Sequence, residues 1–189
     1  MTGYALHLLR HGAPEQTGLL MGRTDCAPTP TGIAACVAKA SGLNVAHLYA
    51  SNLARCRQAG EAIGTAMNLP VTIDPRWREL DFGDWDGRAG AEIDSDALAR
   101  FWADPDAHPP PHGERWSALA ARVGAALDDL PPRPTLIVTH GGAIRAALHR
   151  LCGFDRRQLW SFDLPYGVLV SLSVWPGPRP NAQIASIQP

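Results

Sequence analysis

Short apolar runs alternate with amphipathic segments along most of this chain. The apolar runs are typical of strands and lie at residues 4–9, 47–51, 71–73, 135–140, 167–175 and 182–187. Between several of them, apolar residues recur at helical spacing up to a glycine, an asparagine or a proline, which predicts helices at residues 31–42, 53–68, 92–103, 114–130 and 141–153. Strands that alternate with helices in this way indicate an α/β protein with a mostly parallel sheet.

Residues 76–90 do not fit this alternation. They carry Trp77, Trp85 and four acidic residues without a readable period. We therefore expect an irregular, functional segment there. No internal repeat and no long linker is visible in the sequence, so residues 1–189 are expected to form one domain.

Two of the predicted strands end in the same way. The first strand runs into His11 and a glycine, and the strand at residues 135–140 ends on His140, followed by Gly141. Because ligands of open α/β sheets bind beyond the carboxyl ends of parallel strands, we expect the two histidines to meet there. The glycines let main-chain N–H groups approach a ligand, and the helix that begins at Gly141 points its first N–H groups at the same place. The sequence therefore predicts an anion site.

A third strand end adds positive charge. After the strand at residues 47–51, Arg55 and Arg57 fall in the first turns of a helix, where a cation opposes the helix macrodipole. A guanidinium that faces a phosphate dianion explains this placement, because its planar fork holds two oxygens at once. Arg10, Arg55 and the two histidines would then form a cationic pocket that a phosphate neutralises. Arg57 is equally well explained as a solvated helix residue.

Composition limits the classes of function. Of the 189 residues, 46% are hydrophobic and 19% charged, which suits a domain with a sizeable core. The 17 basic and 18 acidic residues give a net charge of −1 without long like-charge blocks, so we expect neither nucleic acid nor a membrane as a partner. The four cysteines form no CxxC pair, and neither a long apolar run nor a signal-type N-terminus is present. These features indicate free thiols in a cytoplasmic protein.

Four segments at the predicted strand ends and in the irregular region resemble the histidine phosphatase superfamily, which has the phosphoglycerate-mutase-like fold. They are RHG at residues 10–12, SNLARCRQAG at 51–60, RELDFGDWDG at 78–87 and VTHGGAIRA at 138–146, in family order. GRTDCAPTPTG at residues 22–32 is similar to the family's stretch before its first helix, and residues 101–123 resemble its α-ribazole phosphatase-like branch. The resemblance implies a single histidine phosphatase domain over residues 1–189. The implied fold is a three-layer sandwich with a mostly parallel central sheet flanked by helices.

The resemblance also implies a role for each matching residue. His11 is implied to be the nucleophile that becomes a phosphohistidine. Arg10, Arg55 and His140 are implied to hold the phosphate, with His140 counted among the catalytic residues, and Gly141 is a substrate-binding candidate from its place at the helix start. Independently, a neutral imidazole is a good nucleophile near pH 7, and the flanking cations are expected to keep His11 neutral. Arginines and histidines supply the charge stabilisation that a metal supplies elsewhere, so we expect neither a metal nor a cofactor.

Glu79 matches the carboxyl group that protonates the leaving oxygen. A general acid has to be protonated when it acts, and an apolar neighbourhood favours the neutral form. Trp77, Phe82 and Trp85 are candidates to provide it. The alternative proton donors in the same segment are Asp81, Asp84 and Asp86.

The chain departs from the family pattern near the pocket. Ala13 and Pro14 follow the RHG motif where many members have an acid and a hydroxyl residue, and Ala59 replaces a frequent threonine. Thr17 stands where some members place an asparagine that helps bind phosphate, so it is a candidate substrate-binding residue. These departures leave the detail of the pocket open.

The other histidines have simpler explanations. His7, His47 and His149 are expected to be structural or exposed. His108 and His112 have the spacing of a metal-binding pair, but three intervening prolines exclude the helix that would bring them together. The tryptophans that are candidates for contact with a substrate ring are Trp77, Trp85, Trp102 and Trp116.

Three functions from different classes fit the sequence. The first is a metal-independent phosphomonoesterase that acts on a small phosphate monoester through a phosphohistidine, with α-ribazole 5′-phosphate of cobalamin biosynthesis as the leading substrate by resemblance. The second is phosphoglycerate mutase-type transfer, which the HGGAIRA motif disfavours. The third is a non-catalytic phospho-ligand-binding module, which the complete residue set disfavours. The physiological substrate and the oligomeric state, including a homodimer, stay open.

Overall fold

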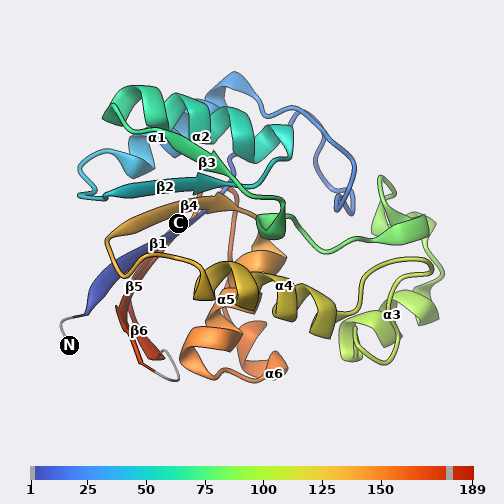
Figure 1. The fold of residues 1–189 in the computed structure, drawn as a ribbon. Helices are drawn as coiled ribbons and strands as arrows, with labels where there is room; N and C mark the ends of the chain where they lie inside the picture. The colour runs from blue at the N-terminus through green and yellow to red at the C-terminus, as the bar shows by residue number, and fades with distance from the viewer. Residues whose placement is uncertain (1–2, 178–180) are drawn as a thin grey trace.

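Six strands form the central sheet of the computed structural model, which describes residues 3–177 and 181–189 (Figure 1). In chain order they are β1 (Tyr4–Arg10), β2 (His47–Ala50), β3 (Val71–Ile73), β4 (Thr135–Thr139), β5 (Leu169–Trp175) and β6 (Asn181–Gln188). Their spatial order is β3-β2-β4-β1-β5-β6. The first four in this order pair in parallel, while β5 and β6 add antiparallel pairings on one side. The sheet is therefore mixed, with the parallel part that the sequence predicts.

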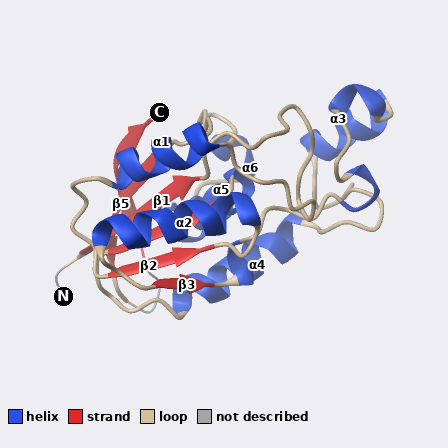
Figure 2. Ribbon diagram, turned by 90° about the horizontal axis from the view of Figure 1, so that it is seen from above, coloured by secondary structure: helices blue, strands red, loops and turns tan. Residues whose placement is uncertain are grey.

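Helices cover both faces of this sheet. They are α1 (Pro30–Ala40), α2 (Ala54–Met67), α3 (Ser95–Ala103), α4 (Trp116–Asp128), α5 (Gly141–Cys152) and α6 (Arg156–Leu159). The first two pack together on one face, and α4 and α5 pack together on the other, with α6 beside α5 (Figure 1). α3 lies apart, beyond the ends toward which the parallel strands point (Figure 2). The predicted single-domain, three-layer α/β fold is confirmed.

Alternate side chains of the central strands face the two helical layers. Leu8 of β1 and Ile137 of β4 are register partners and belong to the core on the side of α4 and α5. Leu9 and Val138, one position further along, belong to the core on the side of α1 and α2. All four side chains are fully buried. A strand that is buried on both faces needs apolar residues at successive positions, which is why both strands read as continuous apolar runs.

The longer helices begin and end close to the predicted positions. The Thr29 hydroxyl accepts a hydrogen bond from the Gly32 N–H (3.0 Å) and caps α1. α2 and α5 end at the left-handed residues Asn68 and Gly153, whose conformation terminates a helix.

Two helical segments differ from the prediction. α3 begins at Ser95 rather than at residue 92, because the Asp94 carboxylate accepts a hydrogen bond from the Ala97 N–H (2.8 Å) and fixes the start of the helix. The short α6 is absent from the predicted elements. Its signal is a reciprocal capping box, in which Asp155 and Gln158 each accept a 2.8 Å hydrogen bond from the other's main-chain N–H.

The predicted irregular segment contains neither an α-helix nor a named strand. It is built around three short 3₁₀ turns, Pro75–Trp77, Gly83–Trp85 and Gly90–Glu92. Such turns have few main-chain hydrogen bonds of their own, so the position of this segment depends on side chains from elsewhere.

Two further observations concern the cysteines and the length of the helices. Cys26, Cys36, Cys56 and Cys152 are all free thiols, as predicted. Among the described residues, no helix has both the length and the apolar character that crossing a bilayer requires.

Gly12 and Gly32 allow the loop after β1 to cross the start of α1 in close contact. A Cβ added to Gly12 would lie 2.1 Å from the Gly32 carbonyl oxygen, and one added to Gly32 would lie 2.6 Å from the Ala13 carbonyl oxygen. From the sequence, the glycine after His11 is expected to let main-chain N–H groups approach a ligand. The structure shows that packing against α1 already requires it.

Gly12→Ala is expected to lower the free energy of unfolding by at least ~2 kcal/mol, because the main chain that the new methyl group meets is held by α1. The matched control is Gly124→Ala in α4, where the nearest atoms to an added Cβ belong to Arg150 at 3.8 Å. This control should gain about 0.5–1 kcal/mol, since alanine is the better helix former. Urea unfolding followed by circular dichroism measures both. A Gly12→Ala protein as stable as the wild type would show that the loop is free to move.

Candidate active site

A cavity of about 200 Å³ opens at the carboxyl ends of β1 and β4, where the sequence predicts an anion site. Its polar lining includes Arg10, His11, Arg55, Glu79, His140 and Gly141. Its apolar lining includes Leu19, Leu20, Met21, Leu80, Phe82, Phe101, Trp102, Trp116, Leu119, Trp160 and Tyr166. Six of the seven candidate site residues therefore converge on one cavity.

His11 follows β1 and is 4% exposed. Its Nδ1 lies 2.8 Å from the carbonyl oxygen of Gly12. Because a carbonyl oxygen only accepts, Nδ1 carries the proton, and Nε2 of the neutral ring keeps a free lone pair. Burial, reinforced by the charge of Arg55, lowers the pKa of His11 to about 3. The ring is therefore neutral at pH 7, as expected, although burial contributes more than the flanking cations.

His140 lies between β4 and α5 and is fully buried. Its ring centroid is 5.1 Å from that of His11. Its Nε2 lies 3.0 Å from the Ser51 hydroxyl oxygen and 3.3 Å from the Cys56 sulfur. Burial and the charge of Arg55 hold the pKa of His140 well below its ordinary value. The two histidines therefore meet as neutral rings.

Arg55 lies in the first turn of α2 and is 1% exposed. Its Nη1 donates to the Thr24 carbonyl oxygen and its Nη2 to the Met21 carbonyl oxygen, both at 2.8 Å. The Asp25 carboxylate accepts a hydrogen bond from the Ala54 N–H (2.5 Å) and supplies the negative group that suits this end of the helix. Since the partners of Arg55 in these two bonds are neutral oxygens, its charge stays available to an anion.

Arg10, the last residue of β1, also lines the cavity. Its Nη1 donates to the carbonyl oxygen of Leu164, and its guanidinium carbon lies 4.3 Å from the centre of the Tyr166 ring. Its Nε is buried and has no hydrogen-bond partner among the residues that the structure describes. A buried, unpaired donor on a cation beside His11 suits an anionic ligand.

Both carboxylate oxygens of Glu79 accept hydrogen bonds from the main chain. The donors are the N–H groups of Leu80 (2.8 Å) and Gly142 (3.0 Å). A Cβ added to Gly142 would lie 2.1 Å from the Glu79 carboxylate, so this approach requires glycine. The sequence predicts that the first N–H groups of α5 bind the ligand. In the structure, the Gly142 N–H at the start of this helix binds Glu79 instead. In the acid form, one oxygen can carry a proton into the cavity and still accept its hydrogen bond.

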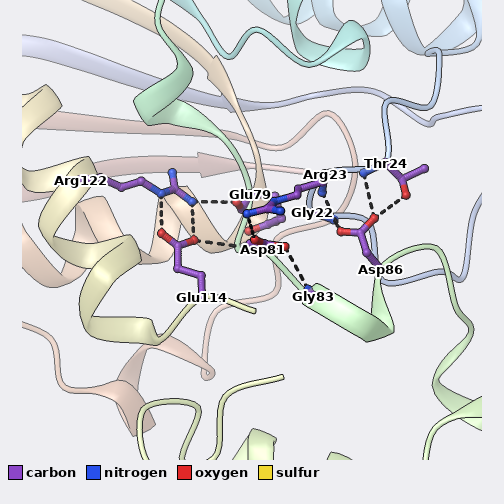
Figure 3. A network of polar contacts seen from close by, with 9 residues as sticks. All are labelled: Gly22, Arg23, Thr24, Glu79, Asp81, Gly83, Asp86, Glu114 and Arg122. Carbon is purple, nitrogen blue, oxygen red and sulfur yellow. Dashed lines mark hydrogen bonds and ion pairs between the residues drawn. The ribbon is translucent and has the colours of Figure 1, made fainter. Parts of the chain in front are cut away.

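Arg122 of α4 fixes the main chain that carries Glu79 (Figure 3). Its Nη1 donates to the carbonyl oxygens of Arg76 and Arg78 at 2.8 Å, and its Nη2 donates to that of Glu79 at 2.7 Å. Its Nε and Nη2 also donate to the Glu114 carboxylate, each at 2.8 Å. One half-buried guanidinium therefore holds a segment that has little regular structure of its own.

Two aspartates of the irregular segment hold a neighbouring loop (Figure 3). Asp86 accepts hydrogen bonds of 2.7–2.8 Å from three successive N–H groups of residues 22–24 and another from the Thr24 hydroxyl. Asp81 pairs with Arg23 at 2.5 Å. Because the Thr24 carbonyl holds the buried arginine of α2, Asp86 positions that arginine indirectly.

Two candidate residues, Thr17 and Arg57, and one departure from the family pattern, Ala59, lie outside the cavity lining. Thr17 is exposed in the loop after β1, so the structure does not bring it to the phosphate site. The Arg57 side chain is 41% exposed and pairs with Glu61 at 3.1 Å, as expected of a solvated helix residue. Ala59, where relatives carry a threonine by the resemblance, is fully buried between α2 and the sheet. Of the two departures from the family pattern that follow the RHG motif, Ala13 and Pro14, the second lines the cavity.

The aromatic and acidic candidates separate into two groups. Trp77 and Trp85 are buried in the core, whereas Phe82, Trp102 and Trp116 line the cavity. The alternative proton donors have other partners. Asp81 and Asp86 hold the loop at residues 22–24, and Asp84 contacts His112 at 3.0 Å. None of these three aspartates lines the cavity.

Sequence reasoning does not single out Arg145, Trp160 and Tyr166, yet all three line the cavity. The Arg145 guanidinium stacks 4.3 Å over the Trp160 ring and donates to the Phe162 carbonyl oxygen (3.1 Å). Burial lowers the pKa of Arg145 to about 10. The argument applied to Arg55, a cation near a helix N-terminus, would also have found Arg145. The two aromatic residues lie in a segment without a readable period.

The remaining histidines make local contacts. His7 Nδ1 lies 2.8 Å from the Ser171 hydroxyl oxygen, and His149 Nδ1 lies 2.7 Å from the Phe154 carbonyl oxygen. Within residues 3–177 and 181–189, no three or more His, Cys, Asp and Glu side chains form a group that could hold a metal ion.

Comparison with known proteins gives consistent matches. The sequence profile described as histidine phosphatase superfamily (branch 1) matches residues 6–181. A glucosyl-3-phosphoglycerate phosphatase of Mycobacterium tuberculosis is 32% identical over 77% of this chain and 74% of its own. The adenosylcobalamin/alpha-ribazole phosphatase of Escherichia coli K12 is 28% identical over 89% of each chain. The native structure of a mycobacterial glucosyl-3-phosphoglycerate phosphatase superimposes with a TM-score of 0.85, at 25% identity over 97% of each chain.

The neutral state of His11 predicts how stability depends on pH. Below its ordinary pKa of 6.5 the unfolded state binds a proton that the folded state, with a pKa of about 3, does not bind. Stability is therefore present above pH 6.5 and is lost as the pH falls, by up to roughly 1.4 kcal/mol per pH unit from this residue. His11→Asn should lose stability less steeply over this range. Urea unfolding at several pH values measures the two slopes, and parallel curves would contradict a buried neutral His11.

Proposed function

The chain belongs to the histidine phosphatase superfamily and is a phosphatase of that superfamily, and from this premise we propose that it hydrolyses a small phosphate monoester, without a metal, through a phosphohistidine intermediate. The observation that carries the proposal is the state of His11. Its Nδ1 is held by the Gly12 carbonyl, its Nε2 has a free lone pair, and two arginines stand beside it. A neutral nucleophile surrounded by cations suits a reaction that brings a phosphate dianion to a nitrogen atom.

The proposed reaction has two steps. In the first, His11 Nε2 attacks phosphorus, the bond from phosphorus to the ester oxygen breaks, and Glu79 gives its proton to that oxygen. In the second, water attacks the phosphohistidine, Glu79 takes a proton from the water, and inorganic phosphate leaves a neutral His11. Arg10, Arg55 and His140 hold the phosphoryl oxygens in both steps.

We extend the proposal to α-ribazole 5′-phosphate, an intermediate of cobalamin biosynthesis, as the substrate. The name of the relative from Escherichia coli supports it, as does a cavity with tryptophans in its lining. The relative from Mycobacterium tuberculosis is named for a different phosphate monoester, so the substrate has to be tested directly. The proposal treats residues 1–189 as one catalytic domain. The free cysteines favour a reducing compartment, and we propose the cytoplasm.

His11→Ala is expected to abolish both turnover and formation of the phosphoenzyme, because it removes the attacking nitrogen. In the wild-type protein, rapid quenching in excess chelator should trap one acid-labile, base-stable phosphoryl group on His11, located by mass spectrometry. His108→Ala is the matched control, since His108 is exposed and lies outside the cavity lining. An adduct on another residue, or activity that needs an added metal, would contradict the mechanism.

Glu79→Gln tests the proton donor through the leaving group. An alkyl alcohol needs a proton as it departs, whereas p-nitrophenolate departs almost unaided. The variant should slow phosphoryl transfer from a sugar phosphate by roughly 10²-fold or more and from p-nitrophenyl phosphate far less. Single-turnover kinetics isolates this first step from the later attack of water.

The structure defines the control for this comparison. A Gln side chain can accept from only one of the two N–H groups that hold Glu79, so some loss through misplacement will affect both substrates. Only the difference between the two substrates reports the proton. Glu61→Gln, on the exposed face of α2, should change neither rate. Equal slowing of both substrates by Glu79→Gln would assign Glu79 a positioning role alone.

A further inference from the structure

A second cation, Arg145, lies beside the phosphate-binding Arg10. Both guanidinium groups flank Gly141, because a Cβ added there would lie 3.3 Å from Arg145 Nη1 and 3.7 Å from Arg10 Cζ. Besides burial, the charges of Glu79 and Arg10 act on the pKa of Arg145. Arg145 contacts Gly141, and the N–H group of the next residue, Gly142, binds the Glu79 carboxylate, so Arg145 lies near Glu79, where the leaving group of the proposed reaction has to be.

Arg145 has one N–H group without a hydrogen-bond partner among the described residues. Its Nε is buried without a hydrogen-bond partner, and no carboxylate in the described part of the chain lies within ion-pair distance of its guanidinium. A half-buried cation without an ion-pair partner is unfavourable unless a ligand supplies an acceptor. The leaving group should therefore present an oxygen or a nitrogen to Arg145.

Beyond Arg145 the cavity wall is aromatic. The Trp160 ring, on which Arg145 stacks, lies 5.7 Å from the Trp102 ring at an angle of 80°. Trp102 is 43% exposed and Trp160 39% exposed. Five large apolar side chains are exposed in residues 3–177 and 181–189, and three of them line this cavity. Exposed apolar area that gathers at one cavity marks a binding surface rather than chance exposure.

The geometry of these rings suits a flat occupant. An edge-to-face pair of indoles forms a corner, in which a planar ring can stack on one face and meet the edge of the other. Arg145 already covers one face of Trp160, and Trp116 lines the same cavity at the start of α4. Stacking of a base on an aromatic side chain contributes about 1–3 kcal/mol, which is enough to select one leaving group over another.

We propose that Trp102, Trp116 and Trp160 form a subsite for a planar heteroaromatic ring on the leaving group. Arg145 donates a hydrogen bond to an acceptor between this ring and the phosphate. The substrate class is therefore a phosphate monoester of a nucleoside-like alcohol. This inference rests on the proposed function, because the subsite and the phosphate site share one cavity, and it deepens that function by assigning the residues that choose the leaving group.

The test compares two ligands that share a phosphate and a pentose, α-ribazole 5′-phosphate with its benzimidazole ring and ribose 5-phosphate without a ring. Calorimetry on the full-length His11→Ala protein gives both Kd values without turnover. The ring-bearing ligand should bind at least 10-fold more tightly. Adding Trp102→Ala should reduce this ratio to about 3-fold or less and leave the Kd of ribose 5-phosphate unchanged, while Trp102→Phe should keep most of the ratio.

Trp175→Ala is the matched control. Trp175 is a tryptophan of similar exposure, 37%, at the end of β5 and outside the cavity lining, and its removal should leave the ratio unchanged. Equal Kd values for the two ligands, or an unchanged ratio in Trp102→Ala, would overturn the ring subsite. The phosphohistidine on wild-type His11 is measured separately, so a failure of the subsite and a failure of the phosphatase function are distinguishable.

Discussion

The positive charge at the carboxyl edge of the sheet is held by main-chain carbonyl oxygens instead of carboxylates. Arg55 donates to carbonyls of the loop at residues 21–24, and Arg10 and Arg145 donate to carbonyls within residues 162–164. A carboxylate would satisfy each guanidinium but would also cancel its charge. Neutral carbonyls fix the geometry and leave the charge for a ligand. The two loops that provide them therefore have to be held in place, and much of the polar structure around the cavity does this.

Together with burial, the same charge sets the chemical state of the proposed catalytic groups. A second cation at His11 or His140 would be buried beside arginines, so both rings stay neutral, and the Gly12 carbonyl selects the tautomer of His11, the proposed nucleophile. Among the described residues that line the cavity, Glu79 is the one carboxylate, and the N–H groups of Leu80 and Gly142 bind its two oxygens. The proposed proton donor and the proposed nucleophile are thus each held by main-chain contacts.

Much of the fold could be predicted from local sequence, because buried strands and capped helices leave strong signals. The ends of β1 and β4 placed His11 and His140 correctly for the same reason. What failed depended on tertiary packing. Thr17 follows a family position, but its loop turns it to solvent. Trp160 and Tyr166 line the cavity from the segment after α5, and no period within that segment reports this, whereas Arg145 lies in α5 near a helix N-terminus and could have been found. The role of Glu79 came from resemblance alone, since its segment is shaped by a distant helix.

That distant control has a consequence for how the protein can change over generations. Arg122 donates hydrogen bonds to the main-chain carbonyl oxygens of residues 76, 78 and 79. Every amino acid provides such an oxygen. Changes to side chains of this stretch therefore do not remove the acceptors of these hydrogen bonds, as long as Arg122 and Glu114 are kept. The neighbouring Leu80 and Phe82 line the cavity and pack into the core, so other apolar side chains of similar volume can replace them while Glu79 stays in place. A lineage can in this way acquire a new substrate by altering the wall of the cavity without first losing its chemistry.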